Sequence, residues 1–74
     1  MTLYELVDNV KLQGNIRISM WDFMGETEKV IATWENSVNE LFVGDIEDEW
    51  ADLIVDYIFC PGDGWLHIEV KEEE

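Results

Sequence analysis

The segment from Glu40 to Asp56 restricts the possible fold more than any other part of the sequence, because it combines dense negative charge with closely spaced apolar residues. It holds seven acidic residues and no basic one. The acidic residues are Glu40, Asp45, Glu47, Asp48, Glu49, Asp52 and Asp56, and the apolar ones include Leu41, Phe42, Ile46, Trp50, Leu53, Ile54 and Val55. A disordered acidic tail lacks such apolar residues. The segment therefore predicts negative charge held on a folded surface, with the rest of the chain as its scaffold.

Length and charge narrow the class of protein. The 74 residues correspond to one small domain spanning residues 1–74. With 18 acidic and 4 basic residues the net charge is −14, which argues against direct binding to nucleic acid or to an anionic membrane. The same excess favours a basic partner, high solubility or a salt-rich habitat. No signal peptide and no run of about 20 apolar residues is visible, so we expect an intracellular, cytoplasmic protein.

The first half of the chain predicts a helix followed by a β-hairpin. Thr2 and Glu5 have capping-box spacing, and an apolar stripe predicts a helix from Thr2 to Val10. Alternating apolar residues then predict two strands joined by a turn at residues 24–28. The strands run from Asn15 to Phe23 and from Lys29 to Glu35.

The second half predicts short helical turns and then another hairpin. Ser37 and Glu40 again have capping-box spacing, so one turn is expected there, broken at Gly44. Asp45 is expected to cap a second turn that ends at Glu49. Two further strands follow around a turn at residues 61–64, one from Ala51 to Cys60 and one from Trp65 to Lys71.

This order predicts an α+β fold in two layers, with the N-terminal helix packed on a four-stranded antiparallel sheet. Alternation assigns a core of Leu6, Val10, Ile18, Val30, Val55, Tyr57, Leu66 and Ile68. The opposite face of the sheet is then expected to carry Arg17, Trp21, Ile31, Thr33, Ile54, Ile58, Trp65 and His67. That face is unusually apolar for one in contact with water.

The residues that could bind a metal ion or take part in catalysis lack the neighbouring residues that these functions require. Asp45, Glu47 and Glu49 have the 1-3-5 spacing of a calcium loop, but Trp50 stands at the sixth position, where glycine is needed. The lone His67 is expected to be a half-exposed strand residue, and the lone Cys60 a packed small side chain without a nearby base. We therefore expect no metal, no cofactor and no enzymatic activity.

The four tryptophans are more informative. Trp34 is expected in the core, whereas Trp21 and Trp65 alternate onto the face away from the helix. Exposed aromatic side chains are typical of interface hot spots, so core and interface are equally plausible for these two residues.

The acidic residues favour a protein that imitates nucleic acid. DNA carries one charge about every 3.4 Å per strand, and strand residues two apart lie roughly 6.7 Å apart. Asp52 and Asp56, with Asp45, Glu47, Asp48 and Glu49 before them, would form a row of charges on a similar scale. Such a row fits a basic groove of a nucleic-acid-binding protein.

In size, low pI and compact α+β pattern with an acidic loop, the chain resembles small acidic proteins of phages and mobile elements, including anti-CRISPR and anti-restriction DNA mimics. The resemblance implies a non-enzymatic inhibitor or modulator acting in the cytoplasm of a bacterial host cell. It involves no signature motif, and it therefore assigns no functional residue.

Two alternatives remain open. In the first, the apolar sheet face with Trp21, Ile31, Ile54 and Trp65 is a protein-interaction or homodimer surface, and the acidity serves solubility. In the second, the chain is an acidic domain from a salt-rich organism.

Overall fold

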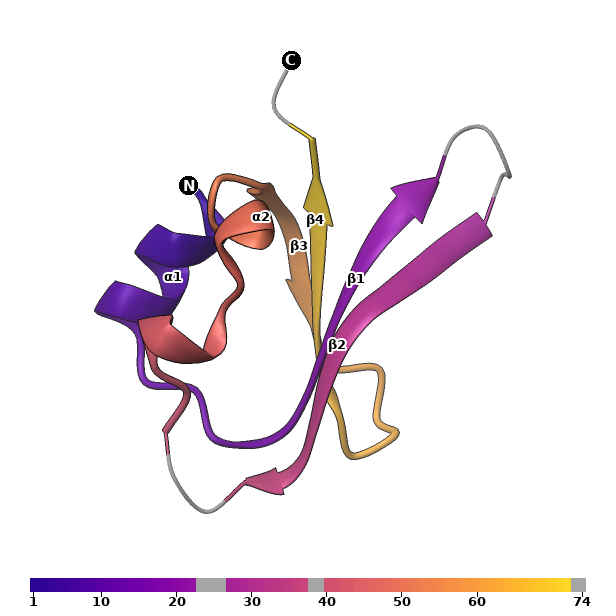
Figure 1. Cartoon of the computed structure of the whole chain (residues 1–74). Coiled ribbons are helices and arrows are strands. Elements are labelled where there is room, and N and C mark those ends of the chain that lie inside the picture. Colours follow the sequence, from indigo (N-terminus) through magenta and orange to yellow (C-terminus); the bar gives the residue numbers. More distant parts are fainter. Residues whose placement is uncertain (23–26, 38–39, 73–74) are drawn as a thin grey trace.

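Helix α1 (Leu3–Asn9) begins at the capping box that the sequence predicts. The computed structural model describes residues 1–22, 27–37 and 40–72 (Figure 1). The Glu5 backbone N–H donates to Thr2 Oγ1 at 3.1 Å, and the Thr2 backbone N–H donates to Glu5 Oε1 at 3.0 Å. The helix ends before Val10, whose backbone is already extended. Val10 is consequently exposed, and its assignment to the core is wrong.

Four strands form a single sheet. They are β1 (Gly14–Asp22), β2 (Thr27–Ser37), β3 (Ile54–Phe59) and β4 (Leu66–Lys71), in the spatial order β2-β1-β4-β3. The α+β class and the four-stranded sheet are thus confirmed. The predicted turn at residues 24–28 lies partly outside the described residues, and Thr27 and Glu28 belong to β2. Phe23, predicted to end the first strand, also lies outside the described residues.

The sheet is mixed, so the prediction of a fully antiparallel sheet is wrong. Each hairpin is antiparallel, but the two inner strands, β1 and β4, run parallel to each other. The reason is the long connection between β2 and β3, which the structure describes over residues 40–53. Strand β2 finishes at one end of the sheet, and β3 begins at the other (Figure 1). A connection of this length can cross the sheet, as parallel pairing requires.

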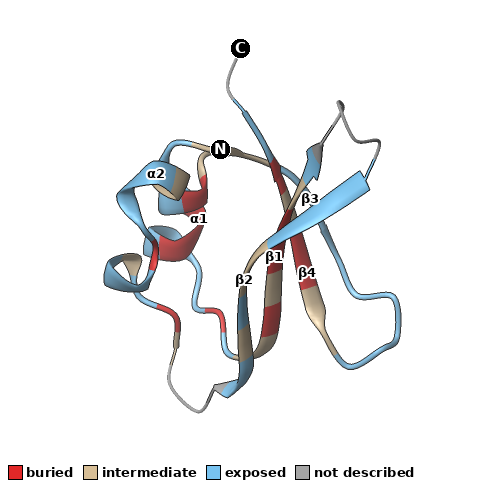
Figure 2. Cartoon of the chain, turned by 45° about the vertical axis from the view of Figure 1, so that its right-hand side comes forward, coloured by how far each residue is buried: buried red, intermediate tan, exposed pale blue. Residues whose placement is uncertain are grey.

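Over its described residues, the crossing connection contains two short helical elements, η1 (Val43–Asp45) and α2 (Asp48–Ala51). They lie on the same side of the sheet as α1 (Figures 1 and 2). The helical turn predicted after Ser37, over Leu41 and Phe42 up to Gly44, lies partly outside the described residues. In the described part the prediction is wrong, because Ser37 belongs to β2, residues 40–42 are not helical, and Gly44 lies within η1. The second short helix exists, but it begins after Glu47 rather than at Asp45.

The core lies between the central strands and the helical segments. Ile16 and Ile18 of β1 and Ile68 and Val70 of β4 are almost completely buried (Figure 2). They share one apolar cluster with Leu3, Leu6, Val7, Leu12, Leu41 and Ile46. Of the predicted core, Leu6, Ile18 and Ile68 are buried, and Val55 and Leu66 are partly buried against the cluster.

Two register shifts move predicted core residues to the other face of the sheet. A shift between Ile18 and Ser19 brings Val30 opposite Ser19, and Val30 is 49% exposed. A shift between Val55 and Tyr57 brings Tyr57 opposite Glu69, and Tyr57 is 61% exposed. A β-bulge of this kind reverses the facing of the residues beyond it. The assignments of Val30 and Tyr57 to the core are therefore wrong.

Candidate binding surfaces

The first candidate surface is the acidic ridge, which we define as Asp45, Glu47, Asp48, Glu49 and Asp52. All five residues are exposed, and they lie on η1, on α2 and at their ends. Beneath them Ile46 is buried, and Trp50 and Leu53 are partly buried against the apolar cluster. The ridge is thus attached to the core on its inner side.

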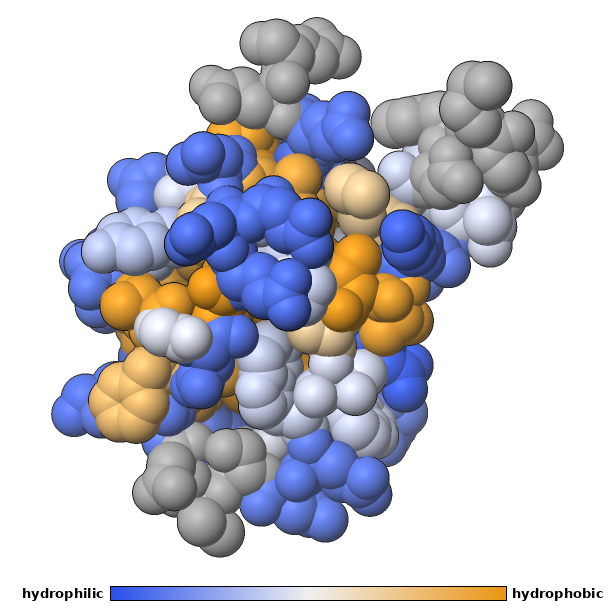
Figure 3. Space-filling view, viewed as in Figure 1, coloured by the Kyte–Doolittle hydropathy of each residue, from blue (hydrophilic) through white to orange (hydrophobic). Residues whose placement is uncertain are grey.

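Backbone hydrogen bonds hold the ridge in place. The Phe42 N–H donates to Asp45 Oδ2 at 3.0 Å, which fixes the first carboxylate. The Trp50 N–H donates to the Glu47 carbonyl at 2.9 Å, and the Leu53 N–H donates to the Trp50 carbonyl at 3.1 Å. Figure 3 shows hydrophilic side chains gathered over α2.

The ridge carries its charges along a helical turn. Asp52 lies at the C-terminal end of α2 with helical backbone angles, so it is i+4 to Asp48 and i+3 to Glu49. Side chains at these spacings have Cβ atoms about 5–6 Å apart. Asp56 belongs instead to β3, where its Oδ1 lies 3.7 Å from Lys71 Nζ. Asp52 and Asp56 therefore do not share a strand, and Asp56 lies apart from the ridge.

The second candidate surface is the open sheet face, the side of the sheet away from the helical segments. Trp21 and Phe59 are 40% and 42% exposed, and Val30 and Tyr57 are also exposed there. Trp65 is half-buried, with the Arg17 guanidinium carbon 5.0 Å from its ring centroid. Trp21 is therefore exposed on this face, and Trp65 is half-buried beside Arg17.

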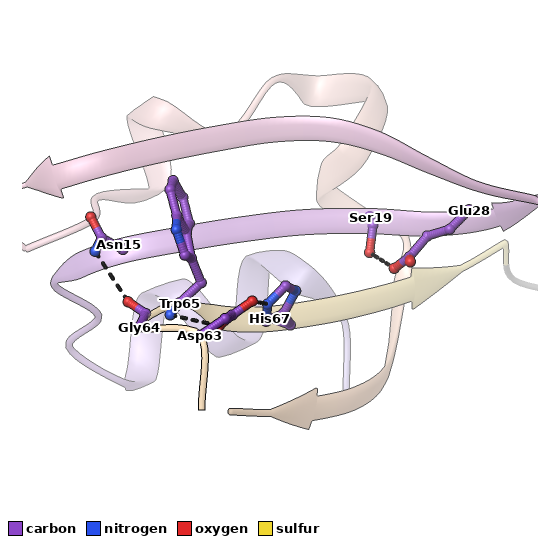
Figure 4. Close-up of polar contacts among 7 residues, drawn as sticks. All are labelled: Asn15, Ser19, Glu28, Asp63, Gly64, Trp65 and His67. Atoms are coloured by element: carbon purple, nitrogen blue, oxygen red, sulfur yellow. Dashed lines mark hydrogen bonds and ion pairs between the residues drawn. The ribbon is translucent and has the colours of Figure 1, made fainter. Parts of the chain in front are cut away.

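At one end of the open sheet face, Asp63 accepts hydrogen bonds from neighbouring residues. It lies in the turn between β3 and β4 (Figure 4). The His67 Nε2–H donates to Asp63 Oδ2 at 2.8 Å, and the Trp65 backbone N–H donates to Asp63 Oδ1 at 2.9 Å. These donors, the His67 hydrogen bond first, lower the pKa of Asp63. The His67 ring also stacks on Phe59, with centroids 5.1 Å apart.

His67 is consequently only 8% exposed, so the expectation of a half-exposed histidine is wrong. The sequence signal was the turn at residues 61–64, in which Gly62 and Gly64 adopt positive φ values of 95° and 84°. Such angles favour glycine and bring the chain back over the start of β4. The spacing of four residues between Asp63 and His67 then allows the contact.

The other end of the open sheet face carries carboxylates. The Ser19 hydroxyl of β1 donates to the Glu28 carboxylate of β2 (Figure 4). Partial burial raises the pKa of Glu69, and the negative charges of Glu28 and Asp56 raise it further. This end of the face would therefore accept a positive charge favourably.

Other features of the described residues give weaker support for a binding or catalytic site. Cys60 is an exposed free thiol, so the expectation that it is packed is wrong. No group of three or more His, Cys, Asp or Glu residues in the described ranges is arranged to hold a metal ion. A hollow of about 220 Å³ lies between the end of α1 and residues 40–43, beside the 3.8 Å ion pair of Lys11 and Glu40. Within the ranges that the structure describes, no helix has the length and apolar content needed to cross a membrane.

Comparison with known proteins gives no assignment, because no family model, curated protein or solved structure matches the chain. Function must therefore be argued from the surfaces themselves.

Proposed function

We propose that this chain is a non-enzymatic acidic binding protein that occupies the basic groove of a nucleic-acid-binding protein and so inhibits or modulates it. The observation that carries the proposal is the acidic ridge, in which five exposed carboxylates occur within residues 45–52 with no basic residue among them. The proposed setting is the cytoplasm of a bacterial cell, as for the DNA-mimic inhibitors of phages and mobile elements.

The spacing of the ridge supports this function. Carboxylates on one helical turn lie about 5–6 Å apart at their Cβ atoms, and their side chains can spread or converge. DNA presents one charge about every 3.4 Å along each strand, so a groove built for phosphates meets charges on a comparable scale. Lys and Arg side chains that line such a groove are flexible enough to adjust to the difference.

The attachment of the acidic ridge to the core also supports the proposed binding to a basic groove. Ile46, Trp50 and Leu53 pack against the apolar cluster, and the Phe42 N–H holds Asp45. A backbone that is already ordered before binding loses less conformational entropy when the complex forms. In this proposal the fold has two layers, in which the sheet supports the helical segments and these present the charges to the partner.

The test is capture from a bacterial lysate on immobilised protein, followed by elution with salt steps and with duplex DNA. Wild-type protein should retain basic nucleic-acid-binding proteins that duplex DNA releases. The variant Asp45→Asn, Glu47→Gln, Asp48→Asn, Glu49→Gln should lose them while keeping its circular dichroism spectrum.

A matched control removes four charges elsewhere, through Asp8→Asn, Glu35→Gln, Glu40→Gln and Glu72→Gln. It has the same net charge as the ridge variant and should keep binding. If both variants lose the captured proteins equally, binding depends on total charge, and the ridge has no special role.

A second function, a protein-interaction module that uses the open sheet face, is supported by the exposure of Trp21, Tyr57 and Phe59. In that case Trp21→Ala would abolish capture, the ridge variant would still bind, and salt would have little effect because buried apolar contacts are not screened.

A further inference from the structure

The two outer strands of the sheet differ in how they are protected against pairing with another chain. An outer strand presents unpaired backbone N–H and C=O groups, which natural proteins protect with charges, bulges or covering segments. Strand β2 carries Glu28, Lys29 and Glu35, and its pairing with β1 contains two register shifts. Strand β2 is therefore protected along its length.

Among the described residues, contacts cover strand β3 only where it begins. The N-terminal residues cover this part through a bridge between Thr2 and Ile54, and the Val55 N–H donates to the Met1 carbonyl at 2.8 Å. Beyond the register shift, the three residues Tyr57, Ile58 and Phe59 are all exposed, Ile58 at 48%. A run of exposed apolar residues on an outer strand is a site for strand pairing.

The apolar end of β3 is also uncharged, which is unusual in this chain. No acidic or basic residue occurs from Tyr57 to Gly62, although the chain carries a net charge of −14. Phe59 is held by its stacking on His67, which Asp63 fixes in turn. This strip is therefore an uncharged surface on which two highly negative molecules could meet without placing carboxylates opposite each other.

We propose that β3 pairs antiparallel with β3 of a second copy of this chain, about a two-fold axis at Ile58. Such pairing puts Tyr57 opposite Phe59 of the partner subunit and Asp56 opposite Cys60 of the partner subunit. Cross-strand aromatic pairs stabilise a sheet, whereas like charges directly opposite each other destabilise it, and this register avoids them. The result is one continuous sheet through both subunits.

The charge of the chain determines how such a dimer responds to salt. Two subunits of −14 repel each other, and salt screens the repulsion, with a Debye length of about 10 Å at 0.1 M and about 3 Å at 1 M. Self-association should therefore strengthen as salt is added. Binding to a basic partner should weaken under the same change, so this inference and the proposed function can fail separately.

Sedimentation equilibrium of the full chain at the two salt concentrations tests the inference. Wild-type protein should contain dimer, with a larger fraction at high salt. Ile58→Lys should be monomeric at both, because pairing would bury two like charges at the axis, and salt does not remove the cost of desolvating them. Val30→Lys, at an equally exposed residue of β2 on the open sheet face, should dimerise like the wild type.

A cysteine variant keeps the test decisive even if Ile58→Lys fails to fold. Residues opposite each other in antiparallel strands have Cα atoms about 4.5–5.5 Å apart, which is within reach of a disulfide. Ile58→Cys in a Cys60→Ser background should therefore form a disulfide-linked dimer on mild oxidation, and Val30→Cys in the same background should not. The inference is overturned if the wild type is monomeric at high salt, if Val30→Lys alone abolishes the dimer, or if the two cysteine variants cross-link equally.

Discussion

Because of the register shift in β3, we expect very different losses of stability when two neighbouring residues of the sheet are truncated to alanine. Ile68 is completely buried and lies opposite Ile58, whereas Tyr57 is 61% exposed and lies opposite Glu69. Ile68→Ala removes three carbon groups at about 0.8 kcal/mol each, and the cavity raises the total cost to about 3–4 kcal/mol. Tyr57→Ala should cost less than about 1 kcal/mol, because most of the side chain is already in water.

Urea unfolding followed by tryptophan fluorescence measures both costs. The experiment should be run at low protein concentration, so that self-association does not contribute, and at about 0.5 M salt, so that repulsion is screened. With a denaturant dependence of about 1 kcal/mol per molar, Ile68→Ala should lower the midpoint by about 3–4 M and Tyr57→Ala by less than about 1 M. If Tyr57→Ala costs as much as Ile68→Ala, then Tyr57 belongs to the core and the shifted register is refuted.

Three further predictions concern single contacts, each measured by thermal or urea unfolding. Thr2→Ala should cost about 1 kcal/mol by removing the capping box of α1, and Thr2→Ser should cost much less, whereas equal losses would exclude a capping role. Because the pKa of Asp63 is lowered in the folded state, its carboxylate stabilises the fold at pH values above the ordinary pKa of 3.8, and this stability is lost as pH falls below 3.8. Asp63→Asn should therefore lower the melting temperature at pH 7 more than at pH 3. A difference in melting temperature that is the same at both pH values would contradict the contact with His67. The raised pKa of Glu69 means that the folded state holds its proton more tightly than the unfolded state, so stability is lost as pH rises above 4.5. Glu69→Gln should therefore be stabilising at pH 7 and neutral below pH 4.5, and a loss of stability at pH 7 would contradict this.

The elements that the sequence predicts correctly are those with a local signal. The Thr2 and Glu5 capping box predicts where α1 begins, and the alternation around Ile18 and Ile68 identifies the buried face of β1 and β4. In each case neighbouring residues determine the outcome, so the pattern can be recognised without knowledge of the tertiary structure.

The errors arise where distant parts of the chain decide the structure. The alternation after Leu53 extends through Phe59 without a break, yet the bulge turns Tyr57 outward, and no local pattern marks the position of a bulge. The parallel pairing of β1 with β4 depends on where the connection at residues 38–53 enters the sheet. These features depend on tertiary contacts, which composition and periodicity do not encode.

The candidate site was predictable only in part. The position of the acidic residues near the surface could be inferred because Ile46 and Trp50 alternate with them and anchor the segment. The helical spacing from Asp48 to Asp52 could not, because four residues are too few for a recognisable helical period. The contact of Asp63 with His67 depends on the turn between β3 and β4, and it was missed.

The decisive measurement for the proposal that the acidic ridge binds a basic groove is the affinity for a captured partner as a function of salt concentration. The logarithm of the binding constant should fall steeply and linearly with the logarithm of salt concentration, because the contacts are ionic. The four neutralising substitutions at Asp45, Glu47, Asp48 and Glu49 should both weaken binding and flatten this slope, whereas the matched control should leave both unchanged. A binding constant that is independent of salt and identical for wild type and ridge variant would refute the proposal.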